Sequence, residues 1–154
     1  MSATSNGPPP KGPRPLEKAL GRDDAEWARQ HLADDVVGWL TTVAPDGTPQ
    51  SSVISFLWEG ETILFYSQPD TPKLRNIARS PLVSFNLQSD RYGDHLLIIE
   101  GTATEDRTIP ASDEHPAYRA KYREPLEHWG MGESETARDF SVPIRITPGR
   151  VRLA

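Results

Sequence analysis

The feature that most constrains the fold is a succession of short segments rich in β-branched and aromatic residues and joined by tight turns. The first three span residues 36–44, 49–58 and 61–68. Pro45-Asp46-Gly47 separates the first pair and Glu59-Gly60 the second, and both sequences are typical of turns. Because strands joined by such short links pair antiparallel, the sequence predicts a three-stranded meander.

Three further segments of this character lie in the second half of the chain, at residues 82–88, 95–104 and 140–153. Gly101 falls within the middle segment, where a glycine is typical of a β-bulge. The last segment is expected to kink near Pro148-Gly149. Six strands with short links favour a closed antiparallel barrel over a βαβ fold, so the expected fold class is mainly β, with a few short helices.

The N-terminal part has two contrasting halves. Residues 1–15 hold five of the 15 prolines and no leucine, isoleucine, valine or aromatic residue, so they are predicted to form a disordered tail. Residues 16–34 are predicted to be helical, with Asp23 or Asp24 as the cap. The apolar face of this helix is expected to comprise Trp27, Ala28, Leu32 and Ala33. A single folded domain is therefore expected over residues 16–154.

Composition excludes several classes of function. The net charge of −5 disfavours non-specific binding to nucleic acid and to anionic membranes, which both require an excess of basic residues. The absence of cysteine excludes disulfides, thiolate nucleophiles, cysteine zinc sites and iron–sulfur clusters. No apolar run is long enough for a transmembrane helix, and the N-terminus lacks a signal-peptide core, so a cytoplasmic protein is expected.

A second predicted helix, at residues 72–80, begins with groups that can bind an anion. Thr71 is placed as its N-cap and Pro72 at its first position, and Pro81 ends it. Its free amides, the hydroxyls of Ser67 and Thr71 and the ammonium of Lys73 would lie together. The positive charge of Lys73 opposes the helix dipole, which favours a bound negative partner. The alternative is that Thr71 and Pro72 form an ordinary helix cap, and that the basic residues of this helix are simply solvated.

Other classes of site have weaker support. The four histidines, which lack the spacing of metal ligands, are His31, His95, His115 and His128. Glu133 and Glu135 are expected in a polar loop that follows an irregular helical stretch at 111–128, interrupted by Pro116 and Pro125. The aromatic residues expected in the core or in a dimer interface are Trp39, Phe56, Trp58 and Phe65.

Six short motifs occur in a fixed order across residues 36–105. They are a T-x-x-x-D-G-x-P hairpin, an apolar strand ending in W-x-G, an F-Y-[ST] strand, an [ST]-x-K-x-x-N-[IL] helix start, an [SR]-x-P-x-V-[SA] return strand and an E-G-x-A strand. In this order they resemble the split β-barrels of the pyridoxamine-phosphate-oxidase-like family. The chain is most similar to the branch of flavin/deazaflavin oxidoreductases described as probable enzymes of coenzyme F420, which is common in actinobacteria.

The resemblance implies a homodimer with two equivalent cofactor sites at its interface. The residues that match the phosphate-binding motifs are Ser67, Thr71, Pro72 and Lys73, with Arg75 and Arg79 on the same helix near an acidic cofactor tail. The residues that match the strand along the cofactor ring are Ser51, Ser52, Val53, Ile54 and Ser55, although this strand could also simply face solvent. Residues around Trp129 are expected to reach across from the second protomer.

The chain departs from true pyridoxamine phosphate oxidases at three places. Their R-x-V-L-L-K strand, S-R-K pair and C-terminal arginine motif are replaced here by Q-S-S-V-I-S, Thr71-Pro72-Lys73 and P-G-R-V-R-L-A. These differences argue against pyridoxamine as the substrate.

One lysine and a helix N-terminus suit the singly charged phosphodiester of F420 better than the phosphomonoester of FMN, which carries about two charges. The resemblance therefore implies hydride transfer from reduced F420 to a small organic acceptor, and it identifies no catalytic side chain. An FMN-dependent oxidoreductase of the same fold is one alternative. A non-catalytic flavin or haem carrier is another, with His95 as the histidine to consider for haem, and a structural dimer without a ligand is the third.

Overall fold

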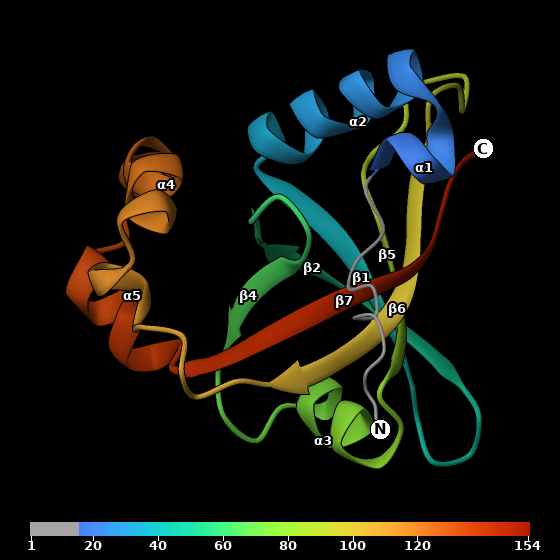
Figure 1. The fold of residues 1–154 in the computed structure, drawn as a ribbon. Helices are drawn as coiled ribbons and strands as arrows, with labels where there is room; N and C mark the ends of the chain where they lie inside the picture. The colour runs from blue at the N-terminus through green and yellow to red at the C-terminus, as the bar shows by residue number, and fades with distance from the viewer. Residues whose placement is uncertain (1–15) are drawn as a thin grey trace, which may run out of the picture.

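The computed structural model, which describes residues 16–154, has one antiparallel sheet at its centre. The strand order is β2-β1-β5-β6-β7-β4-β3, and the sheet curls into a half-barrel (Figure 1). The predicted tail, residues 1–15, lies outside the described residues. The strands are β1 (Val37–Val43), β2 (Pro49–Ser55), β3 (Leu57–Trp58), β4 (Ile63–Ser67), β5 (Leu82–Asn86), β6 (Leu97–Glu105) and β7 (Val142–Leu153).

The sheet has seven strands, so the expectation of six was wrong, because the predicted strand 49–58 is divided at Phe56. The Phe56 N–H donates to the hydroxyl oxygen of Tyr122 over 2.8 Å, and that hydroxyl lies 3.0 Å from the Phe56 carbonyl oxygen. A side chain thus occupies both backbone groups of Phe56. The chain therefore leaves the β1–β2 ladder at this residue, and the next two residues pair with β4 instead.

The division at Phe56 also explains why the sheet curls. The strands at its two edges, β2 and β3, follow each other along the chain with only Phe56 between them. Because one residue can span only about 3.5 Å, the two edges must lie side by side. The sheet therefore curves until its two edges meet, which is consistent with a split barrel.

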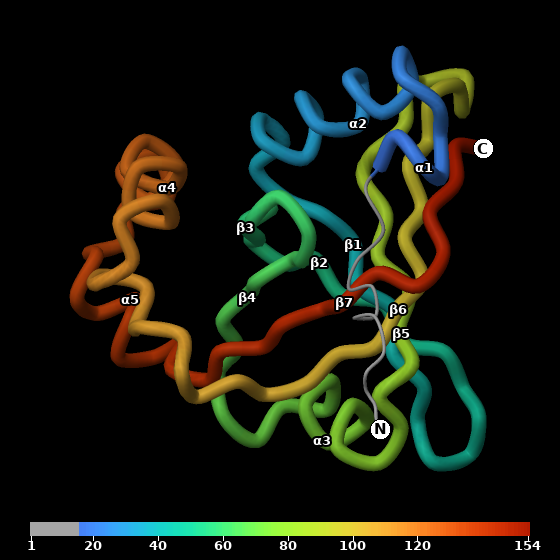
Figure 2. Tube along the Cα trace, viewed as in Figure 1, coloured from blue at the N-terminus to red at the C-terminus, as the bar shows by residue number. Residues whose placement is uncertain are grey.

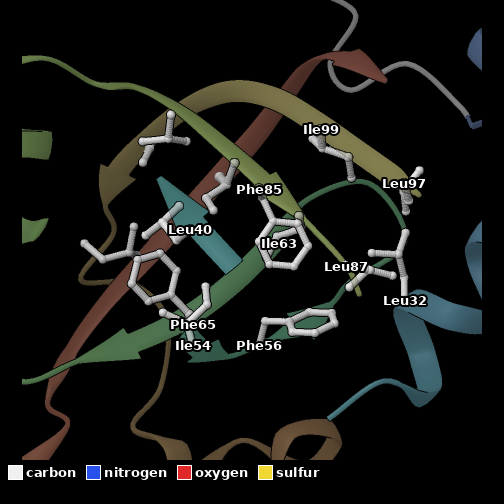
Figure 3. Close-up of a cluster of buried hydrophobic side chains, with 14 of the residues drawn as sticks. Leu32, Leu40, Ile54, Phe56, Ile63, Phe65, Phe85, Leu87, Leu97 and Ile99 are labelled. Carbon is white, nitrogen blue, oxygen red and sulfur yellow. The ribbon is translucent and has the colours of Figure 1, made fainter. Parts of the chain in front are cut away.

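The concave side of the sheet carries the main apolar core (Figure 3). The rings of Phe56 and Phe85 meet edge to face with their centroids 5.0 Å apart. In β1, Leu40 is fully buried while the neighbouring Trp39 points outward and is 39% exposed, as the two-residue period of a strand requires. Leu32, from a helix outside the sheet, closes one end of this core.

Two short helices precede the sheet where one was predicted. They are α1 (Leu16–Leu20) and α2 (Arg22–Asp34), and they are separated by Gly21, whose φ of 85° is a backbone conformation that favours glycine. Gly21 is therefore the N-cap of α2, and the prediction of Asp23 or Asp24 as the cap was wrong. Ala28 and Leu32 are buried as expected, whereas Ala33 is exposed.

The remaining helices lie at other positions around the sheet. α2 covers one end of the half-barrel, α3 (Pro72–Arg79) lies at the opposite end, and α4 (Pro116–Trp129) and α5 (Glu133–Asp139) stand to one side (Figures 1 and 2). Pro116 begins α4 and Pro125 lies within it, so neither proline interrupts the helix. The acidic pair Glu133 and Glu135 belongs to α5, so the expectation of a polar loop was wrong.

The predicted bulge is present at this position, but its extra residue lies on β7, opposite Gly101. The pairing of β6 with β7 shifts register between Glu100, which faces Arg150, and Gly101, which faces Pro148, so Gly149 is left unpaired. A Cβ atom on Gly101 would lie 2.2 Å from the Thr147 carbonyl oxygen, so only glycine allows the two backbones to approach this closely. Next to the bulge, the carboxylate of Glu100 lies 3.5 Å from the guanidinium of Arg152.

Within residues 16–154, every helix is too short or too polar to traverse a bilayer.

The contact between Phe56 and Tyr122 predicts the effect of Tyr122→Phe. Phe56 is fully buried, so the substitution leaves its N–H without a partner away from water. We expect the free energy of unfolding to fall by about 1–3 kcal/mol, measured by urea denaturation. Tyr92→Phe is the control because Tyr92 is 79% exposed, and it should change stability by less than about 0.5 kcal/mol. Equal stability of Tyr122→Phe and the unmodified chain would contradict this account.

Candidate functional site

A cavity of about 260 Å³ lies between the sheet and the α4–α5 pair. β2 contributes Val53, Ile54 and Ser55 to its lining, β4 contributes Tyr66 and the first turn of α3 contributes Lys73. The remaining lining residues come mostly from the segment that precedes β7: Val37, Ser112, Tyr118, Arg119, Tyr122, Leu126, Trp129, Met131, Glu133, Thr136 and Phe140.

Aromatic rings form one wall of the cavity. Tyr118 and Tyr122 stack with centroids 4.7 Å apart, and Tyr66 meets Tyr118 edge to face at 4.9 Å. Trp129 continues the row at 6.4 Å from Tyr122. An apolar wall of aromatic side chains is typical of cavities that bind small organic ligands.

The tyrosine hydroxyls in this wall stay protonated at neutral pH. Burial raises the pKa of Tyr66 and of Tyr118, and it raises the pKa of Tyr122 to about 12. The charges on the cavity lining therefore belong to Lys73 and to a pair formed by Arg119 and Glu133.

Lys73 is half-buried and faces the cavity, yet its ammonium has no hydrogen-bond or ion-pair partner within residues 16–154. Burial lowers the pKa of Lys73, as expected for a cation moved partly out of water. The helix that carries it is fixed by the buried Asn76, whose amide donates to Thr42 Oγ1 over 3.0 Å and to Gln50 Oε1 over 2.8 Å. Lys73 is thus held in place with no counter-ion from residues 16–154.

The other predicted phosphate-binding residues are engaged with the protein itself. Thr71 caps α3, as predicted, because its Oγ1 accepts from Leu74 N, and Pro72 takes the first helical position. The Ser67 hydroxyl, 1% exposed, donates to Gln68 O over 2.8 Å and lies 3.2 Å from Thr71 Oγ1. Neither hydroxyl lines the cavity, so a phosphate contact at these two residues stays a prediction.

The remaining predicted residues lie away from the cavity lining. Ser51 Oγ lies 2.8 Å from Thr41 Oγ1 on the exposed face of β1 and β2, and Ser52 is half-buried beside it. Arg75 is exposed and donates to the carbonyl oxygen of Asp70 over 2.6 Å. Of the predicted cofactor residues, Val53, Ile54, Ser55 and Lys73 are therefore the ones that the fold brings together.

The aromatic wall was missed by the sequence analysis, although a signal for it exists. Tyr118, Tyr122, Leu126 and Trp129 recur at intervals of three and four residues, which places them on one face of a helix. Pro116 and Pro125 obscure this pattern, because prolines commonly interrupt helices. Trp129 lines the cavity of its own chain, and its expected reach into the site of a partner stays a prediction.

A polar network fixes the start of α4. His115 is the N-cap, and its Nδ1 accepts from the Tyr118 N–H over 3.3 Å. Its Nε2 therefore carries the proton and donates to Glu59 Oε2 at 3.2 Å. Glu59 Oε1 accepts from Arg145 of β7 over 2.8 Å. The wall of the cavity is thus tied to the β3–β4 turn and to the sheet.

Lys121 fixes the middle of α4. Its Nζ donates to the Phe56 carbonyl oxygen over 2.9 Å, lies 3.4 Å from the Leu32 carbonyl oxygen and sits 3.8 Å from the centroid of the Phe56 ring. Burial lowers the pKa of Lys121 to about 8, although the charges of Asp35 and Asp34 oppose this shift.

Within residues 16–154, no group of three or more His, Asp or Glu residues is arranged to hold a metal ion. His95 is exposed and lies beside Trp27, with ring centroids 5.3 Å apart, away from the cavity lining.

A family model described as pyridoxamine 5'-phosphate oxidase matches residues 25–153. No curated protein matches the sequence. Among solved structures, a Listeria innocua protein provisionally named pyridoxamine 5'-phosphate oxidase is 26% identical, with a TM-score of 0.62 over 83% of this chain and 95% of that one. An F420 reductase is 25% identical, with a TM-score of 0.55 over 82% and 92% of the two chains. A haem storage protein from Vibrio cholerae, 16% identical over 83% and 92%, shares the fold with a TM-score of 0.60.

The lowered pKa of Lys121 predicts a pH dependence of stability. The unfolded chain, with a lysine pKa near 10.5, binds more protons than the folded chain between pH 8 and 10.5, so stability should rise with pH in this window. From pH 7.5 to 9.5 we expect a rise of about 1–2 kcal/mol in the free energy of unfolding. Lys121→Met should reduce this slope and the exposed Lys18→Met should not. A slope unchanged by Lys121→Met would contradict the assignment.

Proposed function

Because the chain belongs to the pyridoxamine 5'-phosphate oxidase family, we propose that it is an oxidoreductase that binds coenzyme F420 in this cavity and transfers a hydride to a small organic acceptor. The family fold is one that binds flavin-type cofactors, and F420 is the member of that class proposed here. The F420 reductase that is 25% identical supports this choice over most of both chains.

The observation that carries the proposal is the ammonium of Lys73. Partial burial removes some of the water around this cation, and no residue among 16–154 pairs with it, which favours a ligand that supplies a negative charge. The cavity beside it has an apolar, aromatic wall formed by Tyr118, Tyr122 and Trp129. A planar ring system attached to a single anionic group fits both features.

The residues present fit such a cofactor and suggest a division of labour. Lys73 would bind the phosphate, and β2, through Val53 and Ser55, would lie along the ring. When bound in its reduced form, F420 supplies the hydride, and the acceptor takes up a proton to complete its two-electron reduction. The rings of the α4 wall would exclude water from the reacting face, and their protonated hydroxyls would keep that face uncharged.

FMN is the alternative cofactor, and the charge of the site favours F420. Among residues 16–154, Lys73 is the basic residue of the cavity lining that has no ion-pair partner. Arg75, which was expected near the acidic tail of the cofactor, donates to the Asp70 carbonyl oxygen and lies outside the cavity lining. One cation balances the phosphodiester of F420 more closely than a phosphomonoester with about two charges.

Titration with each cofactor tests the proposal. We expect F420 to bind with a dissociation constant below about 100 μM, equivalent to 5–6 kcal/mol, and more tightly than FMN. Lys73→Ala should weaken F420 binding by about 1.5–3 kcal/mol, because a charge-assisted hydrogen bond is lost, while Lys18→Ala serves as the control of the same residue type. Fluorescence quenching provides the measurement.

Each possible result has a consequence. If neither cofactor binds, the proposed function fails. If FMN binds more tightly than F420, the choice of F420 fails. If Lys73→Ala binds as tightly as the unmodified chain, Lys73 does not belong to the site.

We also propose that two chains associate through the outer face of the sheet. Trp39 of β1 pairs across the ladder with Val53 of β2, and these side chains are 39% and 47% exposed. Leu82 of β5, on the same sheet, is 65% exposed. Large exposed apolar side chains grouped in this way are typical of a surface that another molecule covers.

Sedimentation tests this association. The chain should sediment as a dimer at micromolar concentration, and Leu82→Glu should shift it towards the monomer because a charge would be buried in the contact. Tyr92→Glu, on the exposed loop before β6, is the control with the same added charge. A monomeric unmodified chain would rule out the dimer.

A further inference from the structure

The mouth of the cavity holds a second basic residue whose charge is already matched. Arg119 of α4 donates from Nε to Glu133 Oε2 over 2.8 Å and from Nη2 to Oε1 over 3.2 Å. Both residues line the same cavity as Lys73. The two parallel contacts form the fork geometry in which a guanidinium binds any carboxylate, whether from the protein or from a ligand.

The pair is open to exchange. The side chains of Arg119 and Glu133 are 46% and 41% exposed, so water screens their attraction and competes for both partners. Neither residue has another ion-pair partner within residues 16–154. Glu133 comes from the first turn of the short helix α5, next to the turn at Gly130–Gly132, so it can move away without disturbing the sheet.

Lys73 and Arg119 are the two basic residues that line the cavity, and they differ in state. Lys73 is half-buried and has no ion-pair partner among the residues that the structure describes, whereas Arg119 is exposed and paired with the carboxylate of Glu133. This difference suggests that the bound ligand has two anionic groups. One would bind Lys73 directly, and the other would have to displace Glu133 from Arg119. The charge of Glu133 then acts as an internal competitor for the second group.

We propose that Arg119 is a carboxylate-binding residue of the cavity, and that Glu133 occupies it until a ligand carboxylate takes its place. This inference rests on the proposed function and specifies the ligand further, as a planar molecule with a carboxylate in addition to the group bound by Lys73. The carboxylate comes either from the tail of the cofactor or from the acceptor. The two sources share one chemistry and can be distinguished by experiment.

The experiment compares Glu133→Gln, Arg119→Gln and the unmodified chain. Glu127→Gln is the matched control because it removes the same charge from α4 outside the cavity lining. The first arm titrates each protein with F420, which has a carboxylate tail, and with FMN, which has none. The second arm titrates the cofactor-loaded proteins with 4-nitrobenzoate and with nitrobenzene, which differ by one carboxylate.

Glu133→Gln should tighten binding of the carboxylate-bearing probe by about threefold to fivefold, and Arg119→Gln should weaken it by a similar factor, because an exposed pair contributes little. An effect confined to F420 assigns the carboxylate to the cofactor tail, and one confined to 4-nitrobenzoate assigns it to the acceptor. FMN and nitrobenzene should bind unchanged.

Two results would overturn the inference. One is that neither substitution alters the affinity for any probe. The other is that both substitutions weaken FMN and nitrobenzene as well, because the ion pair would then only hold α4 against α5. If Lys73→Ala still weakens cofactor binding in either case, the proposed function stands without this subsite. Failure of every probe to bind the unmodified chain would remove both.

Discussion

The hydroxyl of Tyr122 makes the contact on which the rest of the structure depends. It accepts from Phe56 N and lies 2.5 Å from the Val36 carbonyl oxygen and 3.0 Å from that of Phe56. Because this hydroxyl hydrogen-bonds to the N–H and the carbonyl oxygen of Phe56, β2 ends there and the chain turns towards β4. The same contact attaches α4 to the sheet, so one side chain both sets the curl of the sheet and positions the wall of the cavity.

The electrostatics of the cavity follow from that attachment. Three basic residues near the contact between α4 and the sheet, Lys121, Lys73 and Arg119, differ in their environment. Lys121 is buried against the Phe56 ring and two carbonyl oxygens, which makes it part of the scaffold. Lys73 faces the cavity and has no partner in the described part of the chain, whereas Arg119 faces it paired with Glu133. A ligand therefore meets one cation that is free and another that must first be released, within a lining that is otherwise largely apolar.

Features set by neighbouring residues could be predicted from the sequence. The start of α3 at Thr71-Pro72 depends on a side-chain cap and on the fixed φ of proline, both of which are local. The bulge at Gly101 likewise depends on one residue. Lys73 was expected at an anion site, and the structure places it at the cavity, although whether an anion binds there is still a proposal.

Features set by distant residues could not be predicted. The break at Phe56 is caused by the side chain of Tyr122, 66 positions further along the chain, and no residue within 49–58 indicates it. Spacing also could not reveal that the hydroxyls of Ser67 and Thr71 lie next to each other and away from the cavity lining. The helical face that carries Tyr118 was legible in its periodicity, but Pro125 concealed it, because a proline inside a helix is uncommon.

The route of the chain between β6 and β7 has a consequence for how this protein can change. These strands are direct neighbours that pair from Leu97 to Glu105, yet residues 106–141, which include α4 and α5, make a detour between them. The entropy of closing a loop grows only with the logarithm of its length, so a longer or shorter detour would cost the sheet little. Evolution can therefore change the length and the lining residues of this segment while the lysine on α3 stays in place, provided that Tyr122 keeps its contact with Phe56.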